Sequence, residues 1–395
     1  MQQSRTREVP VFLAMGFRPF FLAAGVWAAV ALALWLGILG GWIHLPTRFD
    51  PLAWHVHEML FGFILAGIAG FLLTAIPNWT GRPPISGRWL ALLLGIWAIG
   101  RIVCLVSALL PAWFAGAADL AFPLTLLGVA AHEIVTARDR RNLPVIGPLL
   151  LFVVADSLMQ LTAVGVAVPP GLGWRLGIAA VLVLISVIAG RIVPLFTRNW
   201  LSRRGERKLP AAWGLLDSVA LALLDVALLG WVLRPGLRPL GYFLVLAGVA
   251  SLWRLARWRG GATGGELLVL ILHIAYAWLG LGTAMLGLSL LVRAVPISAA
   301  IHALTVGAIA TMLLAVMTRA TLGHTGRSLT AGPATVAIYL LVTGAAVARI
   351  AAAFIPGPGR LLLFAGGILW IGAFLLFSVV YGRMVFGVPA RRLDS

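Results

Sequence analysis

The sequence predicts an all-α integral membrane protein, a bundle of 12 transmembrane helices with both termini in the cytoplasm. Only 11% of the 395 residues are charged and 61% are hydrophobic, whereas soluble domains carry about a quarter charged residues. The apolar residues occur in runs of about twenty, the length that crosses a bilayer as an α-helix. No stretch between these runs is long enough for a soluble domain, so residues 1–395 are expected to form a single polytopic domain in the lipid bilayer.

Loops rich in Gly, Pro and Arg, such as NWTGRPPISG and GHTGRSLTAGP, separate the twelve spans. Apolar windows place the spans at residues 18–40, 54–77, 87–110, 112–136, 144–168, 173–197, 213–233, 238–257, 264–292, 297–318, 333–355 and 361–382. The second, sixth and tenth spans end in loosely similar sequences (IPNWTGR, LFTRNW and MTRATLGHTGR), which suggests a threefold repeat of four helices.

The basic residues determine the expected orientation. Clusters such as residues 138–141, 198–208 and 254–259 fall in alternate loops, while the other loops hold isolated arginines. The positive-inside rule therefore places both termini in the cytoplasm. The net charge of +18 is spread over these short loops, so nucleic acid is not an expected partner. The single cysteine, Cys104, excludes an intrachain disulfide and a covalent CxxCH haem.

The segment WHVHEM (54–59) carries two of the seven histidines at the start of the second span. The expected topology puts His55, His57 and His302 near the outer surface, whereas His273 lies nearer the cytoplasmic side and His324 follows the tenth span. A lone membrane histidine ordinarily forms an interhelical hydrogen bond, but imidazole is also the commonest metal ligand, and three at one depth favour a metal. At 100° per residue, His55 and His57 point about 200° apart, so they are expected to serve different partners.

Four other polar residues are candidates for proton chemistry. Glu58 beside the histidines is a natural proton carrier, and Tyr276 could donate a proton or simply fill an aromatic position. Asp156 and Arg191 lie at membrane depth, where a proton relay or charge pairing is possible and an interhelical salt bridge is the ordinary alternative.

Several segments together resemble the NnrS family. They are FRPFFLAAGVWA (17–28), WHVHEMLFGF (54–63), AGFLLTAIPNWTGRPP (69–84), RRNLPV (140–145), GRIVPLFTRNWL (190–201), LILHIAYAWLGLG (270–282), SAAIHALTVGAIATM (298–312) and TRATLGHTGR (318–327). The resemblance runs in order from about residue 17 to the end of the chain. NnrS proteins are bacterial inner-membrane proteins that contain haem and copper and are linked to nitric oxide, nitrosative stress and denitrification.

The resemblance implies haem b and copper as cofactors, nitric oxide as a partner and the bacterial inner membrane as the location. The histidines that match the family are His55, His57, His273, His302 and His324. We expect haem ligation by His302 with His55 or His57, and a second metal centre on His273 with His324 as a further candidate. Haem–copper oxidases also have twelve spans and hold a haem between spans two and ten, which is a likeness of fold alone.

The reaction stays open at this point. If the protein is an enzyme, it is a haem/copper oxidoreductase acting on nitric oxide, with Glu58 and Tyr276 as catalytic candidates and an unknown electron donor. The alternative is a proton-coupled 12-span secondary transporter, which fits the buried charges, although the chain shows no duplicated halves. A third hypothesis is a non-catalytic partner of a respiratory complex that docks through the loop TRNWLSRRGERKLP.

Overall fold

The computed structural model describes residues 9–355, 357 and 359–387, which form helices and connections with no strand among them. Twelve helical spans in these residues are long and apolar enough to cross a membrane. The spans are α1 (Phe17–Leu39), α2–η2–α3 (Pro51–His57, Glu58–Ile64, Leu65–Thr80), α4 (Gly87–Leu105), α5 (Ala112–Thr136), η4–α6 (Leu143–Val145, Ile146–Ala163), α7 (Leu172–Ser202), α8 (Leu215–Leu233), α9 (Arg238–Ala256), α10 (Leu267–Leu291), α11–η6–α12 (Ile297–His302, Ala303–Ala310, Thr311–His324), α13 (Pro333–Phe354) and α14 (Gly359–Phe386). Short 3₁₀ turns η1 (Val11–Leu13), η3 (Ser107–Leu109) and η5 (Gly260–Thr263) lie in connections. The all-α class and the number of spans are therefore confirmed.

Two spans change helix type part-way. In span 2 the π-helical segment η2 begins directly after His57, and in span 10 the π-helical segment η6 begins directly after His302. A π-helix widens the turn; it is rare, and where it occurs it is frequently at a functional site. The carbonyl of Gly62 in η2 accepts a hydrogen bond from Trp97 Nε1 of α4 at 3.0 Å. The two spans that carry the outer histidine candidates are thus the two described spans that contain a π-helical segment.

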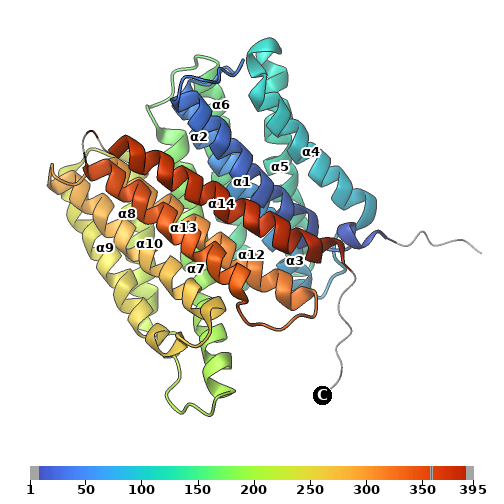
Figure 1. Cartoon of the computed structure of the whole chain (residues 1–395), viewed down its shortest axis with the longest axis vertical. Helices are drawn as coiled ribbons and strands as arrows, with labels where there is room; N and C mark the ends of the chain where they lie inside the picture. Colours follow the sequence, from blue (N-terminus) through green and yellow to red (C-terminus); the bar gives the residue numbers. More distant parts are fainter. Residues whose placement is uncertain (1–8, 356, 358, 388–395) are drawn as a thin grey trace, which may run out of the picture.

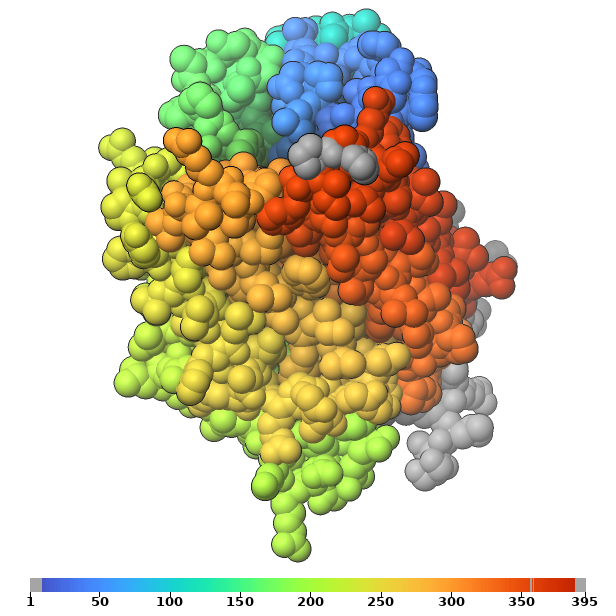
Figure 2. All heavy atoms as spheres, turned by 60° about the vertical axis from the view of Figure 1, so that its left-hand side comes forward, coloured from blue at the N-terminus to red at the C-terminus, as the bar shows by residue number. Residues whose placement is uncertain are grey.

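The packing order shows three units of four spans. In each unit the first helix packs on the second and the third on the fourth, and the fourth helix packs on the first helix of the next unit. The ring closes where α14 packs against α1, which Figures 1 and 2 show as red segments beside blue ones. This order agrees with the threefold repeat expected from the sequence.

Spans 2, 6 and 10, the second helix of each unit, form the centre of the bundle. They are the three most buried spans, with 83%, 67% and 72% of their most apolar stretch buried. The other helices surround them and expose large apolar side chains, among them Leu340, Ile368 and Val226. Because such an outer belt suits lipid rather than water, the chain is a multi-pass membrane protein.

The two described ends of the chain lie together at one end of the bundle. Phe12 stacks on Phe386 with 4.6 Å between ring centroids, and Arg18 Nη1 donates to the carbonyl of Val385 at 2.6 Å. An even number of spans produces this arrangement. Which end faces the cytoplasm stays a prediction from the basic loops.

Candidate metal and cofactor sites

The WHVHEM segment is positioned by the start of α2. Asp50 caps the helix, its Oδ1 accepting from the amide of Ala53 at 3.0 Å, and Pro51 occupies the first turn. The side chains of the two histidines then point in different directions from α2. His55 stacks on Trp35 of α1 with centroids 4.6 Å apart and planes at 11°, while His57 is fully buried against α5 and α6. The structure thus agrees with the opposed facing expected from helical geometry.

His55 lies within electrostatic range of His302. His302 Nδ1 donates to the carbonyl of Ser298 at 2.7 Å, which leaves Nε2 as the lone-pair nitrogen. His55 Nδ1 is buried and has no hydrogen-bond partner among the described residues. His302 and Arg349 both lie close enough to His55 to act on it electrostatically. Arg349, from α13, donates to Ser298 Oγ at 3.2 Å.

This residue set fits a haem. Metal-binding histidines commonly donate their second ring nitrogen to a backbone carbonyl, as His302 does. An unpartnered buried nitrogen, as on His55, is costly unless something binds it. Arg349 forms no ion pair with a carboxylate in the described part of the chain, so its charge is free for an anionic group. We call His55, His302 and Arg349 the paired-histidine site.

His57 lies in a separate, fully buried polar cluster on the other side of span 2. His57 Nε2 lies 2.9 Å from Asp156 Oδ1 of α6 and 3.0 Å from Asp119 Oδ2 of α5, and His57 Nδ1 donates to Glu58 Oε1 at 3.1 Å. Arg101 of α4 forms ion pairs with both Glu58 and Asp119. We call these five residues the His57 cluster.

Two neighbours complete the hydrogen bonding of the His57 cluster. Trp27 Nε1 donates to Glu58 Oε2 at 2.8 Å, and Gln160 Nε2 donates to Asp119 Oδ2 at 2.5 Å. Glu58 therefore accepts from an indole, a guanidinium and an imidazole at once. Such a carboxylate anchors its neighbours, and this arrangement gives no support to the expected role of Glu58 as a mobile proton carrier.

The only groups of three potential metal ligands found among the described residues both contain His57. One group is His57, Asp119 and Asp156, and the other is His57, Glu58 and Cys104. All members are buried. A metal that requires three protein ligands from this part of the chain would therefore bind next to His57.

A second buried polar cluster lies towards the end of the bundle that holds the termini. Arg254 of α9 is fully buried and donates to Asp217 Oδ1 at 3.2 Å and to the hydroxyl of Tyr276 at 2.9 Å. The sequence analysis grouped Arg254 with the basic cluster 254–259 at the end of the predicted span 238–257, whereas the structure buries its side chain inside the bundle. Tyr276 thus accepts a hydrogen bond from a fixed cation and lies in a different cluster from Glu58, so the structure does not join the two expected catalytic residues in one site.

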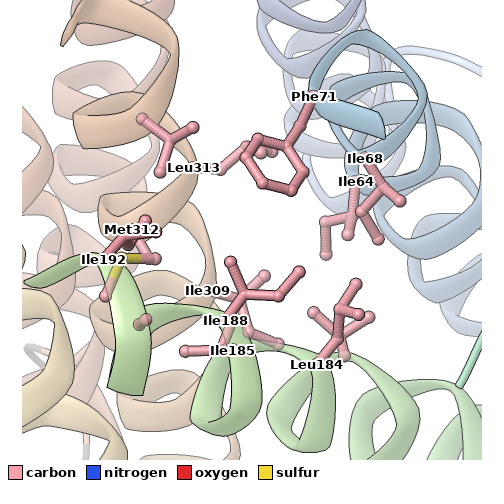
Figure 3. A pocket seen from close by; sticks show the side chains of 13 residues that line it. Ile64, Ile68, Phe71, Leu184, Ile185, Ile188, Ile192, Ile309, Met312 and Leu313 are labelled. Carbon is pink, nitrogen blue, oxygen red and sulfur yellow. The ribbon is translucent and has the colours of Figure 1, made fainter. Parts of the chain in front are cut away.

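An apolar cavity of about 70 Å³ lies between spans 2, 6 and 10. Figure 3 shows side chains from all three spans pointing into the same space, among them Ile64, Leu184 and Ile309. Ile64 is the last residue of η2 and Ile309 lies within η6. The cavity is therefore next to both π-helical segments. The space is partly open, and its apolar lining suits small apolar ligands better than water.

Residues 11–388 match the family of NnrS proteins. The chain belongs to the NnrS family. No curated protein matches the chain.

The other two candidate histidines of this NnrS protein, His273 and His324, lie apart from these sites. His273 Nε2 is hydrogen-bonded to Thr197 Oγ1 at 2.8 Å, and its Nδ1 is buried without a partner. His324, at the end of α12, stacks on Phe17 at 5.4 Å. Neither belongs to a group of three potential ligands in the described chain. The structure therefore gives no support to the second metal centre expected at these residues.

The sequence reading missed how the polar residues of four spans combine in this NnrS protein. The sequence singles out Asp156 at membrane depth without indicating its association with Arg101, Asp119 and Gln160. Arg191, the other charge singled out with Asp156, is exposed and reaches Asn142 Oδ1 at 3.4 Å. Depth was the available signal, because the expected topology puts Arg101, Asp119 and Asp156 in the same half of the membrane as His57.

Proposed function

We propose that this protein binds haem b and copper in the bacterial inner membrane and that it binds or turns over nitric oxide, in nitrosative-stress defence or denitrification. The observation that supports the proposal is the paired-histidine site, where His55 of span 2 lies within electrostatic range of His302 of span 10 and each has a ring nitrogen without a hydrogen bond to the described residues. Membership of the NnrS family supports the link to nitric oxide. Haem, copper and nitric oxide are each part of the proposal.

His55 and His302 would hold the haem iron, and Arg349 would balance the negative charge of its carboxylate side chains. Bound haem supplies a redox-active iron that can carry electrons or bind a gas. The chain contributes the orientation of the ligands. Ser298 fixes the ring of His302 through its carbonyl and also holds Arg349 through its hydroxyl, so one residue positions both groups. Trp35 fixes the ring of His55 by stacking.

The central cavity supports a gas as the partner. Nitric oxide is a small molecule with little polarity, and it enters an apolar space without the desolvation cost that a polar substrate pays. The thirteen residues that line the cavity are all apolar. Polar solutes would lose their hydrogen bonds there.

A specific observation also favours the alternative, a proton-coupled secondary transporter. The His57 cluster buries three carboxylates and an imidazole in the membrane, as transporters do at ion sites. However, transporters usually consist of two repeated halves with the substrate between them, whereas this bundle consists of three units around three central spans. The threefold packing favours the haem proposal.

Titration with nitric oxide tests the proposal. The full chain, purified in detergent after haem-replete expression, is reduced anaerobically and titrated while the visible spectrum and the free gas are recorded. We expect a shift of the haem bands in the wild type, no haem bands in His302→Ala, and wild-type behaviour in the control His132→Ala, whose side chain is exposed on α5. Loss of gas beyond one equivalent per haem would indicate turnover. If the wild type contains haem but its visible bands do not change when nitric oxide is added, the proposal is contradicted.

A further inference from the structure

We propose that His57, Asp119 and Asp156 form a non-haem site for one divalent transition-metal ion. The inference deepens the copper part of the proposed function and rests on it for its biological meaning. Its geometry comes from the His57 cluster alone and does not depend on haem at His55.

The donor atoms are spaced like neighbouring ligands of one ion. His57 Nε2 lies 2.9 Å from Asp156 Oδ1 and 3.0 Å from Asp119 Oδ2. Adjacent ligands of an octahedral ion with bonds of 2.0–2.1 Å are about 2.9 Å apart. Three helices, α2, α5 and α6, supply one donor each. The side chains need little rearrangement to receive an ion.

The orientation of the imidazole also suits a metal. Glu58 Oε1 accepts from His57 Nδ1, so Nε2 of a neutral ring carries the lone pair. That lone pair would face two carboxylate oxygens, which is repulsive unless a proton or a cation lies between them. A carboxylate behind the imidazole of a metal ligand is the usual supporting arrangement. Glu58 is in that position.

The balance of charge suits a divalent ion, because the buried cluster needs two further positive charges, supplied either by one such ion or by two protons. Asp119, Asp156 and Glu58 are fully buried, and Arg101 is the one fixed cation paired with them in the described part of the chain. Protonating His57 leaves one net negative charge in the membrane interior, which is costly. A divalent ion bound to neutral His57 cancels the two remaining charges. The buried cluster is then neutral.

Asp156 supplies the independent observation. Its side chain is fully buried, Oδ1 faces His57, and Oδ2 has no hydrogen-bond partner among the described residues. A buried carboxylate oxygen without a partner is unusual in a folded protein. A cation on Asp156 would satisfy it. The mixed imidazole and carboxylate donors favour Mn²⁺, Fe²⁺, Cu²⁺ or Zn²⁺ over Ca²⁺ or Mg²⁺.

The test counts metal in matched variants of the full chain. Detergent-purified protein is stripped with a chelator, loaded with Mn²⁺, Fe²⁺, Cu²⁺ or Zn²⁺ in turn, desalted and analysed for metal and haem per chain. We expect one non-haem ion per wild-type chain and at least about tenfold weaker binding in Asp156→Asn, by analogy with the loss on removing supporting groups. The control Asp225→Asn changes a carboxylate of α8 that lies outside the His57 cluster and should bind like the wild type. Bound Cu²⁺ or Mn²⁺ should give a paramagnetic resonance spectrum that changes in Asp156→Asn.

The outcomes separate this inference from the haem proposal. If the wild-type protein binds one of the ions but contains no haem, the result supports the metal site and contradicts the haem proposal. Haem bound by a wild type that takes up none of the four ions contradicts the site. Equal metal in the wild type and Asp156→Asn also contradicts it, since the ion then binds elsewhere. If Asp156→Asn elutes as aggregate, Asp119→Asn and Glu58→Gln replace it, with weaker binding expected in each and unchanged binding counting against the site.

Discussion

His55 and His57 are two residues apart, yet each belongs to a different site. His55 lies against Trp35 beside His302, and His57 lies against Asp119 and Asp156. The half-turn between them on α2 separates the two environments. One short segment therefore links the paired-histidine site and the His57 cluster, and a change at either histidine is expected to affect mainly its own side.

Arg101 holds the His57 cluster together, and its removal is expected to be severe. Replacing Arg101 with Leu leaves buried carboxylates without their fixed cation, and breaking a buried pair in this way costs about 3–5 kcal/mol. The sole cysteine, Cys104, is 1% exposed and reports unfolding, because a thiol-reactive dye labels it only when the bundle opens. In Arg101→Leu we expect the dye to label Cys104 at a clearly lower temperature than in the wild type.

The control for Arg101 is Arg82, which pairs with Glu133 near the surface. Surface ion pairs contribute little to stability because water screens them. Arg82→Leu should therefore label at nearly the same temperature as the wild type. An equal fall in labelling temperature in Arg101→Leu and Arg82→Leu would show that the buried Arg101 ion pairs stabilise the fold no more than a surface ion pair does.

At the scale of elements, the π-helical segments and the cavity were beyond sequence reading. Neither EMLFGFI nor ALTVGAIA differs in composition from an ordinary membrane helix. The cavity depends on how Ile64, Leu184 and Ile309 from three spans fail to fill the space between them. Long-range packing between spans determines this cavity, and the spacing of apolar residues along one span cannot predict it.

Filling the cavity is expected to remove a gas-binding site. Ala189 lies on its wall, and Ala189→Leu adds apolar volume there at an overpacking cost of about 1–3 kcal/mol. Crystals of the full chain under xenon pressure should show xenon between spans 2, 6 and 10 in the wild type and little or none in Ala189→Leu. The matched control Ala222→Leu is exposed on α8 and should keep the xenon. Xenon absent from the wild type, or unaffected by Ala189→Leu, would refute the gas cavity.

At the scale of the whole molecule, much of the fold was predictable. Apolar runs determined the number of spans, because the bilayer requires helices of a fixed length. The similar ends of spans 2, 6 and 10 pointed to the threefold repeat that the packing shows. The sites were less predictable. Depth was enough to predict that His55 and His302 lie near each other, whereas the partners of His57 come from three other spans whose neighbours the sequence does not specify.

Orientation is the property of the whole molecule that can be tested most simply. The positive-inside rule predicts that the loop at residue 236 faces the outside and the loop at residue 207 the cytoplasm. Gly236 and Arg207 are both exposed, and the buried Cys104 gives little background. A membrane-impermeant maleimide should label Gly236→Cys in spheroplasts, and Arg207→Cys only after lysis. The opposite labelling pattern would show that the chain has the inverse orientation in the membrane.

The central claim, a haem held between His55 and His302, is tested most directly by a reduced-minus-oxidised visible spectrum. The spectrum is recorded on the detergent-purified full chain, with iron and copper counted per chain in the same sample. We predict b-type haem bands in the wild type and in the control His132→Ala, and their loss in His55→Ala and His302→Ala with the folded elution profile retained. A wild type that is colourless and free of iron after haem-replete expression would contradict the claim, and so would bands that survive in both variants.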